Sequence, residues 1–269
     1  MSASLSRLGF SLDGRAKAPV VWAVLLAGAA LAWAATVRDA MEMGNGPGTM
    51  GRGLAGFMIL WIGMMAAMML PSIAPIGSLY LRSVRSRSTG ALRALRLGAV
   101  ILGYLGAWTA FGMVAFVAAW AGGRLAADAP SAAPWVGAAA LAAAGLYQLT
   151  PFKDRCLSHC RSPLGFLLHF GGYSGRFRDV RVGLYHGGYC VGCCWALFIV
   201  LIAVGIMNLV WMAGFAAVIF LEKTWRFGKT LGVAFGIALL VVAFFVPSHP
   251  ELVPGLHVDG AMGTMRMER

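Results

Sequence analysis

Seven long apolar runs, separated by short polar segments, make up most of this 269-residue chain. Several of them reach the roughly 20 residues that a helix needs to cross a bilayer. The runs cover residues 19–37, 53–81, 97–121, 133–149, 189–206, 208–222 and 230–246. The pattern predicts an all-α, polytopic transmembrane helical bundle of about seven spans, or six if the first run is cleaved as a signal segment.

Glycine, asparagine and proline residues indicate where these runs should change direction or pack closely. The apolar stretch 185–222 is too long for one comfortable span, and Gly205 and Asn208 predict a tight break within it, although a single tilted helix is the alternative. Prolines near the end of the second run should kink or end that helix. Glycines recurring every four residues in the last run predict a face for close helix packing. These residues are Pro71 and Pro75, and Gly228, Gly232 and Gly236.

Composition and charge agree with a membrane protein. The chain is 59% hydrophobic and only 12% charged, with a mean hydropathy of +0.77. Its net charge of +12 comes from basic residues in short loops, which is the positive-inside pattern rather than a nucleic-acid surface. With the N-terminus in the cytoplasm, 17 of the 22 Lys and Arg residues lie inside. We therefore predict a multi-pass protein of the bacterial inner membrane whose general partner is the lipid bilayer, with no nucleic acid.

This orientation divides the chain into three parts. Residues 1–18 form a cytoplasmic N-terminal segment, residues 19–247 a single transmembrane domain, and residues 248–269 a short extracytoplasmic tail. Within the domain, a loop at 150–188 that is rich in Cys and His faces the cytoplasm, where thiols are normally kept reduced.

All five cysteines of the chain lie within 39 residues, interleaved with histidines. The first group has i, i+3, i+4 spacing, so its members share one face if that segment is helical. The second group has the same spacing at the start of the fifth run, and a histidine extends its arc backward if the helix begins early enough; two glycines offer a turn there instead. The groups are Cys156, His159 and Cys160, and His186, Cys190, Cys193 and Cys194.

Thiolates and imidazoles in such numbers suit a soft metal. Copper is the first choice and zinc the second, with an iron–sulfur cluster also compatible, because magnesium and calcium prefer oxygen ligands. The spacing matches no standard zinc or ferredoxin frame, and the alternative is that the cysteines are small apolar fillers. We expect the two groups to converge at the cytoplasmic membrane face.

Methionines cluster on one face of the second run. At helical periodicity Met58 and four further methionines fall within an arc of about 140°. Their thioethers offer a path for Cu(I), and adaptable packing is the alternative. The four that we place in the metal site are Met64, Met65, Met68 and Met69.

The remaining polar residues give weaker indications of function. Glu222 is expected near a membrane helix end, paired with Lys223, Arg226 or a loop arginine, or acting in ion or proton transfer. His169 is expected to be solvated or interfacial, and His249 and His257 lie in the tail. The chain carries no nucleotide-binding or hydrolase motif, so we expect no nucleotide cofactor, and the catalytic residues of any reaction are unknown.

The combination of motifs resembles a known family. The motifs are M-M-A-A-M-M-L-P-S at 64–72, Y-Q-L-T-P-F-K-D-R-C-L-S-H-C-R-S-P-L-G-F at 147–166, H-G-G-Y-C-V-G-C-C-W-A-L at 186–197, G-I-M-N-L-V-W-M at 205–212 and L-E-K at 221–223. Together they resemble the bacterial integral membrane proteins described as predicted metal-binding, the domain of unknown function 2182, over residues 50–225. The resemblance implies a polytopic membrane protein with a metal site.

Three functions are compatible with the sequence. The first is a soft-metal membrane protein that transports, handles or delivers copper, with a metallochaperone or a metalloenzyme under assembly as its partner. The second is a membrane thiol-disulfide oxidoreductase that uses the same cysteines. The third is a non-catalytic assembly factor. On this reading the protein is more a metal binder than an enzyme.

Overall fold

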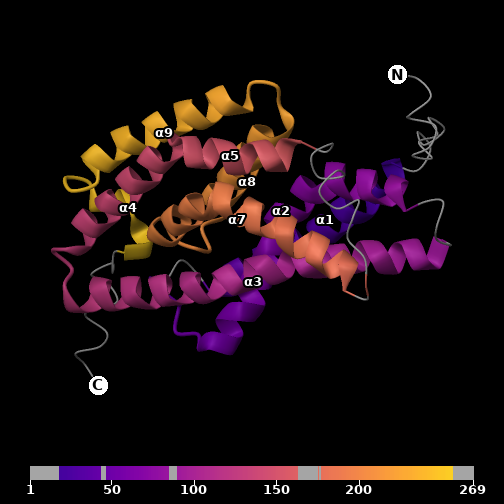
Figure 1. The fold of residues 1–269 in the computed structure, drawn as a ribbon. Helices are drawn as coiled ribbons and strands as arrows, with labels where there is room; N and C mark the ends of the chain where they lie inside the picture. The colour runs from indigo at the N-terminus through magenta and orange to yellow at the C-terminus, as the bar shows by residue number, and fades with distance from the viewer. Residues whose placement is uncertain (1–17, 44–46, 85–89, 163–174, 176, 257–269) are drawn as a thin grey trace.

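The computed structural model describes residues 18–43, 47–84, 90–162, 175 and 177–256 of the chain, and in this part every long element is a helix and none is a strand. The elements are α1 (Ala18–Met43), α2 (Leu54–Ser83), α3 (Gly90–Asp128), α4 (Ala133–Gln148), α5 (Pro151–Arg161), α7 (Arg178–Ala203), α8 (Leu209–Thr224), α9 (Gly228–Phe245), and the 3₁₀ turns η5 (Pro250–Leu252) and η6 (Pro254–Leu256). Figure 1 shows α3 running the length of the molecule, with α7 and α8 lying between it and α9.

A helix lies at each of the seven predicted places, and five of the described helices are long and apolar enough to cross a membrane. These are α1, α2, α3, α7 and α9. The other two, α4 and α8, have 16 residues each and are about 24 Å long, shorter than a hydrocarbon core of about 30 Å. The all-helical class is therefore confirmed for the described residues, and five helices have the length and composition of membrane spans, whereas the count of seven spans and the cytoplasmic N-terminus stay predictions.

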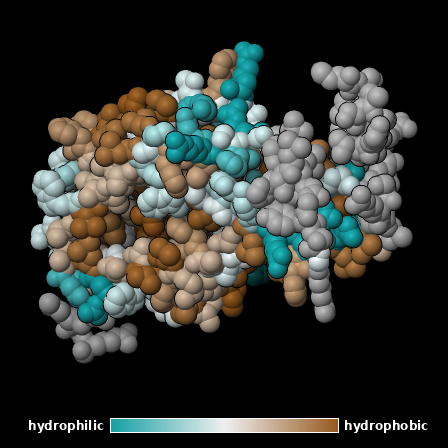
Figure 2. All heavy atoms as spheres, in the orientation of Figure 1, coloured by the Kyte–Doolittle hydropathy of each residue, from teal (hydrophilic) through white to brown (hydrophobic). Residues whose placement is uncertain are grey.

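The outer surface of the bundle is apolar, as lipid contact requires. Trp135 on α4, Val114 on α3 and Phe244 on α9 are all well exposed. Figure 2 shows broad apolar areas over the flank where α4, α9 and the C-terminal half of α3 lie, with hydrophilic residues gathered at its edges. In water such a surface would be a liability, and in a bilayer it is the expected exterior.

Glycines bring α3 and α7 into backbone contact, and these two helices form the most extensive pairing of the fold. A Cβ added at Gly183 of α7 would lie 2.0 Å from the carbonyl oxygen of Val100 on α3. A Cβ added at Gly103 would lie 2.1 Å from the carbonyl oxygen of Val180. Only glycine permits this approach, which is the close packing that small residues provide in membrane helices.

Aromatic rings join α2 to this pair. Trp61 of α2 donates its indole N–H to the carbonyl oxygen of Trp108 on α3 at 2.9 Å. Phe198 of α7 packs edge-on against both indoles, with ring centroids 5.8 Å from Trp61 and 4.9 Å from Trp108. The helix α2 runs through Pro71 and Pro75 to Ser83, so of the two expected effects the end of the helix at these prolines is wrong, and a kink stays a prediction.

The break between α7 and α8 is confirmed. Gly205 adopts a φ of +98°, which L side chains rarely tolerate, and Asn208 caps α8 by accepting from the N–H groups of Val210 and Trp211. The two helices therefore form a hairpin. Gly255 of η6 packs on its turn, because an added Cβ there would meet the carbonyl oxygen of Ile202 at 2.3 Å. Nothing in the sequence indicated that residues 250–256 would pack on the bundle.

Replacing Gly183 by Ala should destabilise the bundle, because the new methyl group collides with the backbone of α3. We expect a loss of about 1–3 kcal/mol, measured as a lower melting temperature of the protein in detergent. Gly188→Ala on the same helix is the matched control, since a Cβ there meets nothing within 4 Å. Equal melting temperatures for the two variants would contradict the α3–α7 contact.

Candidate metal centre

The short helix α5 carries Cys156 and Cys160, and its sequence defines both of its ends. Thr150 caps the N-terminus by accepting from the N–H of Lys153 at 3.3 Å, and Pro151 occupies the first helical position. Asp154 lies in the first turn, and basic residues lie in the last, which suits the helix dipole. The helical spacing that was predicted for this segment is thus present.

A buried ion pair attaches α5 to α8. The ammonium of Lys153 lies 2.6 Å from Oε1 of Glu222, and it also donates to the side-chain oxygen of Gln148. Both charged side chains are almost fully buried, with 2% and 1% of their surface exposed. The partner of the Glu222 carboxylate is therefore Lys153, and the predicted pairing with Lys223, Arg226 or a loop arginine is wrong.

The glycine face of α9 makes room for this ion pair. A Cβ added at Gly232 would lie 2.8 Å from Oε1 of Glu222 and 3.2 Å from Nζ of Lys153. At Gly228 it would lie 2.2 Å from the carbonyl oxygen of Glu222, and at Gly236 it would meet Gln148 of α4. The prediction that these glycines serve close packing is confirmed.

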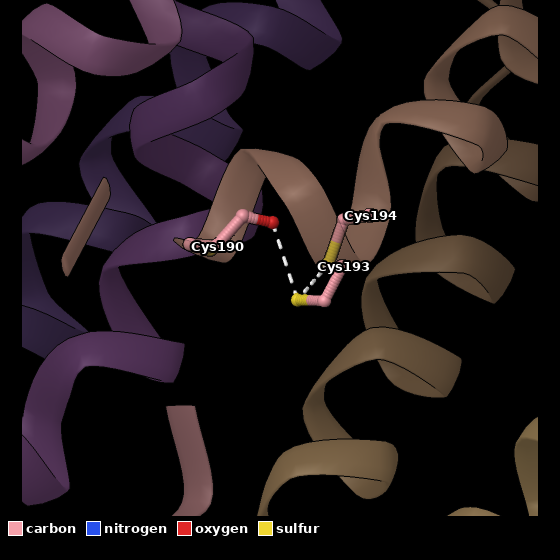
Figure 3. Close-up of side chains that lie close together, drawn as sticks. All are labelled: Cys190, Cys193 and Cys194. Atoms are coloured by element: carbon pink, nitrogen blue, oxygen red, sulfur yellow. Dashed lines mark hydrogen bonds between the residues drawn. The ribbon is translucent and has the colours of Figure 1, made fainter. Parts of the chain in front are cut away.

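Three cysteines of α7 form a compact group of thiols. The sulfurs of Cys190, Cys193 and Cys194 lie within 4.8 Å of one another, and all three residues are buried. The sulfurs of Cys193 and Cys194 are 3.2 Å apart, and the Cys193 thiol donates to the carbonyl oxygen of Cys190 at 3.2 Å. Figure 3 shows both contacts along this stretch of α7. None of the three forms a disulfide.

The helix α5 adds a fourth thiol. The sulfur of Cys160 lies 3.9 Å from that of Cys193, so the two cysteine groups converge as the sequence predicted. Cys156 lies one turn away against Gly192, where an added Cβ would be 3.0 Å from its sulfur. Burial raises the pKa of the Cys156 thiol, so that this thiol is protonated at neutral pH.

Cys190 differs from its neighbours because an ammonium and a phenol hydroxyl from two other helices both hydrogen-bond to its sulfur. The ammonium of Lys223 on α8 and the hydroxyl of Tyr104 on α3 each lie 2.9 Å from Sγ. An ammonium group can only donate, so Cys190 is the acceptor of the Lys223 bond. Neither Lys223 nor Tyr104 was predicted as a site residue; the L-E-K run at 221–223 was the one available signal.

Neither histidine of the predicted site belongs to the group of three sulfurs. His186 is buried on α7 one turn before Cys190, and its ring stacks on Tyr104 with centroids 5.7 Å apart. The helical alternative for residues 186–188 is therefore right and the turn alternative wrong. His159 is exposed on α5, stacks on Tyr189 at 4.2 Å and contacts the carbonyl oxygen of Arg155 through Nδ1.

The remaining predicted residues have mixed outcomes. The methionines of α2 in the predicted metal site, Met64, Met65, Met68 and Met69, are all buried, which fits packing as well as a thioether path. His249 is exposed beside Phe245. His169 and His257 lie outside the described residues.

Comparison with known proteins gives one result. The family whose model matches this chain is described as PpoB2, copper chaperone, and the match covers residues 58–246. This range begins within the second apolar run, ends with the last one, and includes all five cysteines. No curated protein and no solved structure matches the chain.

Lys153→Met should weaken the docking of α5, because it leaves the carboxylate of Glu222 buried without its cation. Breaking one side of a buried pair costs about 3–5 kcal/mol, so we expect a clear fall in melting temperature. Lys229→Met is the matched control, because it breaks the exposed pair with Asp154 at 3.1 Å, worth at most about 1 kcal/mol. The expectation fails if both variants lose the same stability.

Proposed function

The chain belongs to the PpoB2 copper chaperone family, and on that premise we propose that it binds Cu(I) as cargo and hands it to a protein partner. The proposed ligands are the thiolates of Cys160, Cys190, Cys193 and Cys194. The observation that carries the proposal is the group of three buried sulfurs within 4.8 Å of one another, with a fourth 3.9 Å from Cys193.

The donor set supports copper on chemical grounds. Thiolates are soft ligands, and soft ligands select Cu(I) among the common cellular metals. Zinc also accepts four thiolates, so it is the second metal of the proposal. Magnesium and calcium prefer several oxygen ligands, whereas the described side chains that lie close enough together to hold an ion here are three cysteines.

Handling or delivery fits this chain better than active transport. The proposed site would exchange copper by successive replacement of one thiolate by another, which needs no oxidant and no nucleotide. A cytoplasmic metallochaperone, or a metalloenzyme under assembly, is the proposed partner. The exposed position of His159, on the same helix as Cys160, makes it the proposed outer ligand on the route to the thiols, and His186 and Cys156 are proposed as further ligands near them.

The methionine face of α2 is part of the proposal as a thioether path. Replacing Met64, Met65, Met68 and Met69 together by Leu conserves volume, so the fold should persist with a cost below about 1.5 kcal/mol per site. We expect unchanged copper content at equilibrium but slower loading of purified protein from a Cu(I) chelate. Unchanged loading kinetics would reduce these methionines to packing residues.

Thiol–disulfide exchange is the second candidate function, favoured by the 3.9 Å approach of the Cys160 and Cys193 sulfurs. Closing that disulfide would join α5 to α7 and release two electrons and two protons to a partner disulfide, which would be reduced to two thiols. The two functions use the same residues but differ in what is found on the purified protein.

Cys193→Ser should abolish metal binding, because Cys193 is the sulfur that contacts both Cys160 and Cys194. Elemental analysis of protein purified anaerobically in detergent should find about one copper per wild-type chain and none in the variant. Cys156→Ser is the graded comparison and should lose only part of the copper, since Cys156 is proposed as a further ligand and packs on Gly192 outside the three-sulfur group. A wild-type protein without metal, trapped instead as mixed disulfides, would replace copper binding by thiol exchange.

A further inference from the structure

The ammonium of Lys223 is the one feature of the thiol group that a metal site would not be expected to contain. Its Nζ lies 2.9 Å from Cys190 Sγ, where it is close enough to repel a bound cation. Among the described residues, no carboxylate lies within ion-pair distance of it. The titratable groups that interact with it electrostatically are Tyr104, His186, Glu222, the three thiols of α7 and one thiol of α5.

The structure fixes this charge in place. Lys223 lies in the last turn of α8, where the helix dipole favours a cation. The residue before it, Glu222, is tied to Lys153, and Arg161 donates to the carbonyl oxygens of Glu222 at 3.0 Å and Trp225 at 2.7 Å. The Glu222 carboxylate is thus paired with its own partner, and the last turn of α8 presents the Lys223 ammonium to the sulfurs.

We propose that Lys223 is a specificity-determining residue that selects a monovalent over a divalent metal ion at the thiol group. A fixed positive charge repels a divalent ion twice as strongly as a monovalent ion at the same position, while it offsets the negative charge left by several thiolates around Cu(I). The inference rests on the proposed copper binding and adds to it the reason why Zn(II), which accepts the same thiolates, is disfavoured.

The size of the effect follows from Coulomb's law. At a separation of about 6 Å and the effective dielectric constant of about 20 that describes protein sites, one unit of charge on Lys223 shifts the affinity of a singly charged ion by about 100-fold. The affinity for a doubly charged ion shifts by the square of that factor. The ratio of Cu(I) to Zn(II) affinity should therefore change by about 100-fold when the charge is removed.

A variant of Tyr104 distinguishes the effect of the Lys223 charge from the effect of the Lys223 hydrogen bond. The hydroxyl of Tyr104 lies at the same 2.9 Å from Cys190 Sγ as the ammonium, but it carries no charge. Loss of this hydrogen bond should change the affinity of both ions by a similar factor, because the bond acts on the sulfur and not on the charge of the metal. Tyr104→Phe is therefore the matched control for the loss of a donor.

The experiment measures Cu(I) and Zn(II) affinities of the full chain in detergent by competition with chelators of known affinity. Lys223→Met should raise Zn(II) affinity about 100-fold more than Cu(I) affinity, and Lys223→Gln, a second neutral variant in case the first misfolds, should do the same. Three controls should leave the ratio of Cu(I) to Zn(II) affinity within a few-fold of wild type. They are Lys223→Arg, which keeps the charge, Tyr104→Phe, and Lys229→Met, which removes a charge elsewhere.

Two results separate this inference from the function on which it rests. If wild type and the neutral variants bind copper and the affinity ratio does not change, the role of Lys223 in selection is overturned while copper binding stands. If wild type binds neither ion, or keeps copper after Cys193→Ser, the proposed function itself is overturned. A ratio that shifts in Tyr104→Phe as much as in Lys223→Met would assign the effect to the hydrogen bond and also overturn the inference.

Discussion

The buried pair of Lys153 and Glu222 is the interaction on which the thiol group depends. Two opposite charges with 2% and 1% exposure are stable inside a membrane protein only as a pair with good geometry. Lys153 belongs to α5 and Glu222 to α8, and Gly232 of α9 leaves the space that they occupy. The pair therefore fixes α5, and with it the sulfur of Cys160, at one defined position against α7. Without it, three thiols of a single helix would remain.

Packing of α3 on α7 provides the second half of the site. Gly103 and Gly183 let the two backbones touch. Tyr104 follows Gly103 directly, and Cys190 lies two turns after Gly183, so that the two side chains meet between the helices. The same α7 then turns at Gly205 into α8, which returns Lys223 to the level of Cys190. The two side chains that hydrogen-bond to this sulfur thus come from different helices, and their positions follow from backbone packing rather than from loops.

Much of the fold could be predicted from the sequence, because apolar runs of membrane-spanning length indicate the helices directly. The break at Gly205 and Asn208, the glycine face of α9 and the convergence of Cys160 with Cys193 all followed from local pattern or residue type. Hydropathy does not report how far a helix extends beyond the bilayer, so the starts of α3 at Gly90 and of α7 at Arg178 were missed. The pairing of Lys153 with Glu222 spans 69 positions of sequence, and nothing local selects that lysine among the other basic residues.

The contact between Cys160 and Cys193 also has a thermodynamic consequence. A metal ion shared by these two sulfurs would tie α5 to α7 directly, beside the tie that Lys153 already makes through α8. Docking of α5 and occupancy by the ion are then linked equilibria, and each must favour the other by the same free energy. A partner that draws α5 away from α7 would lower the affinity for the cargo, and removal of the cargo would loosen α5.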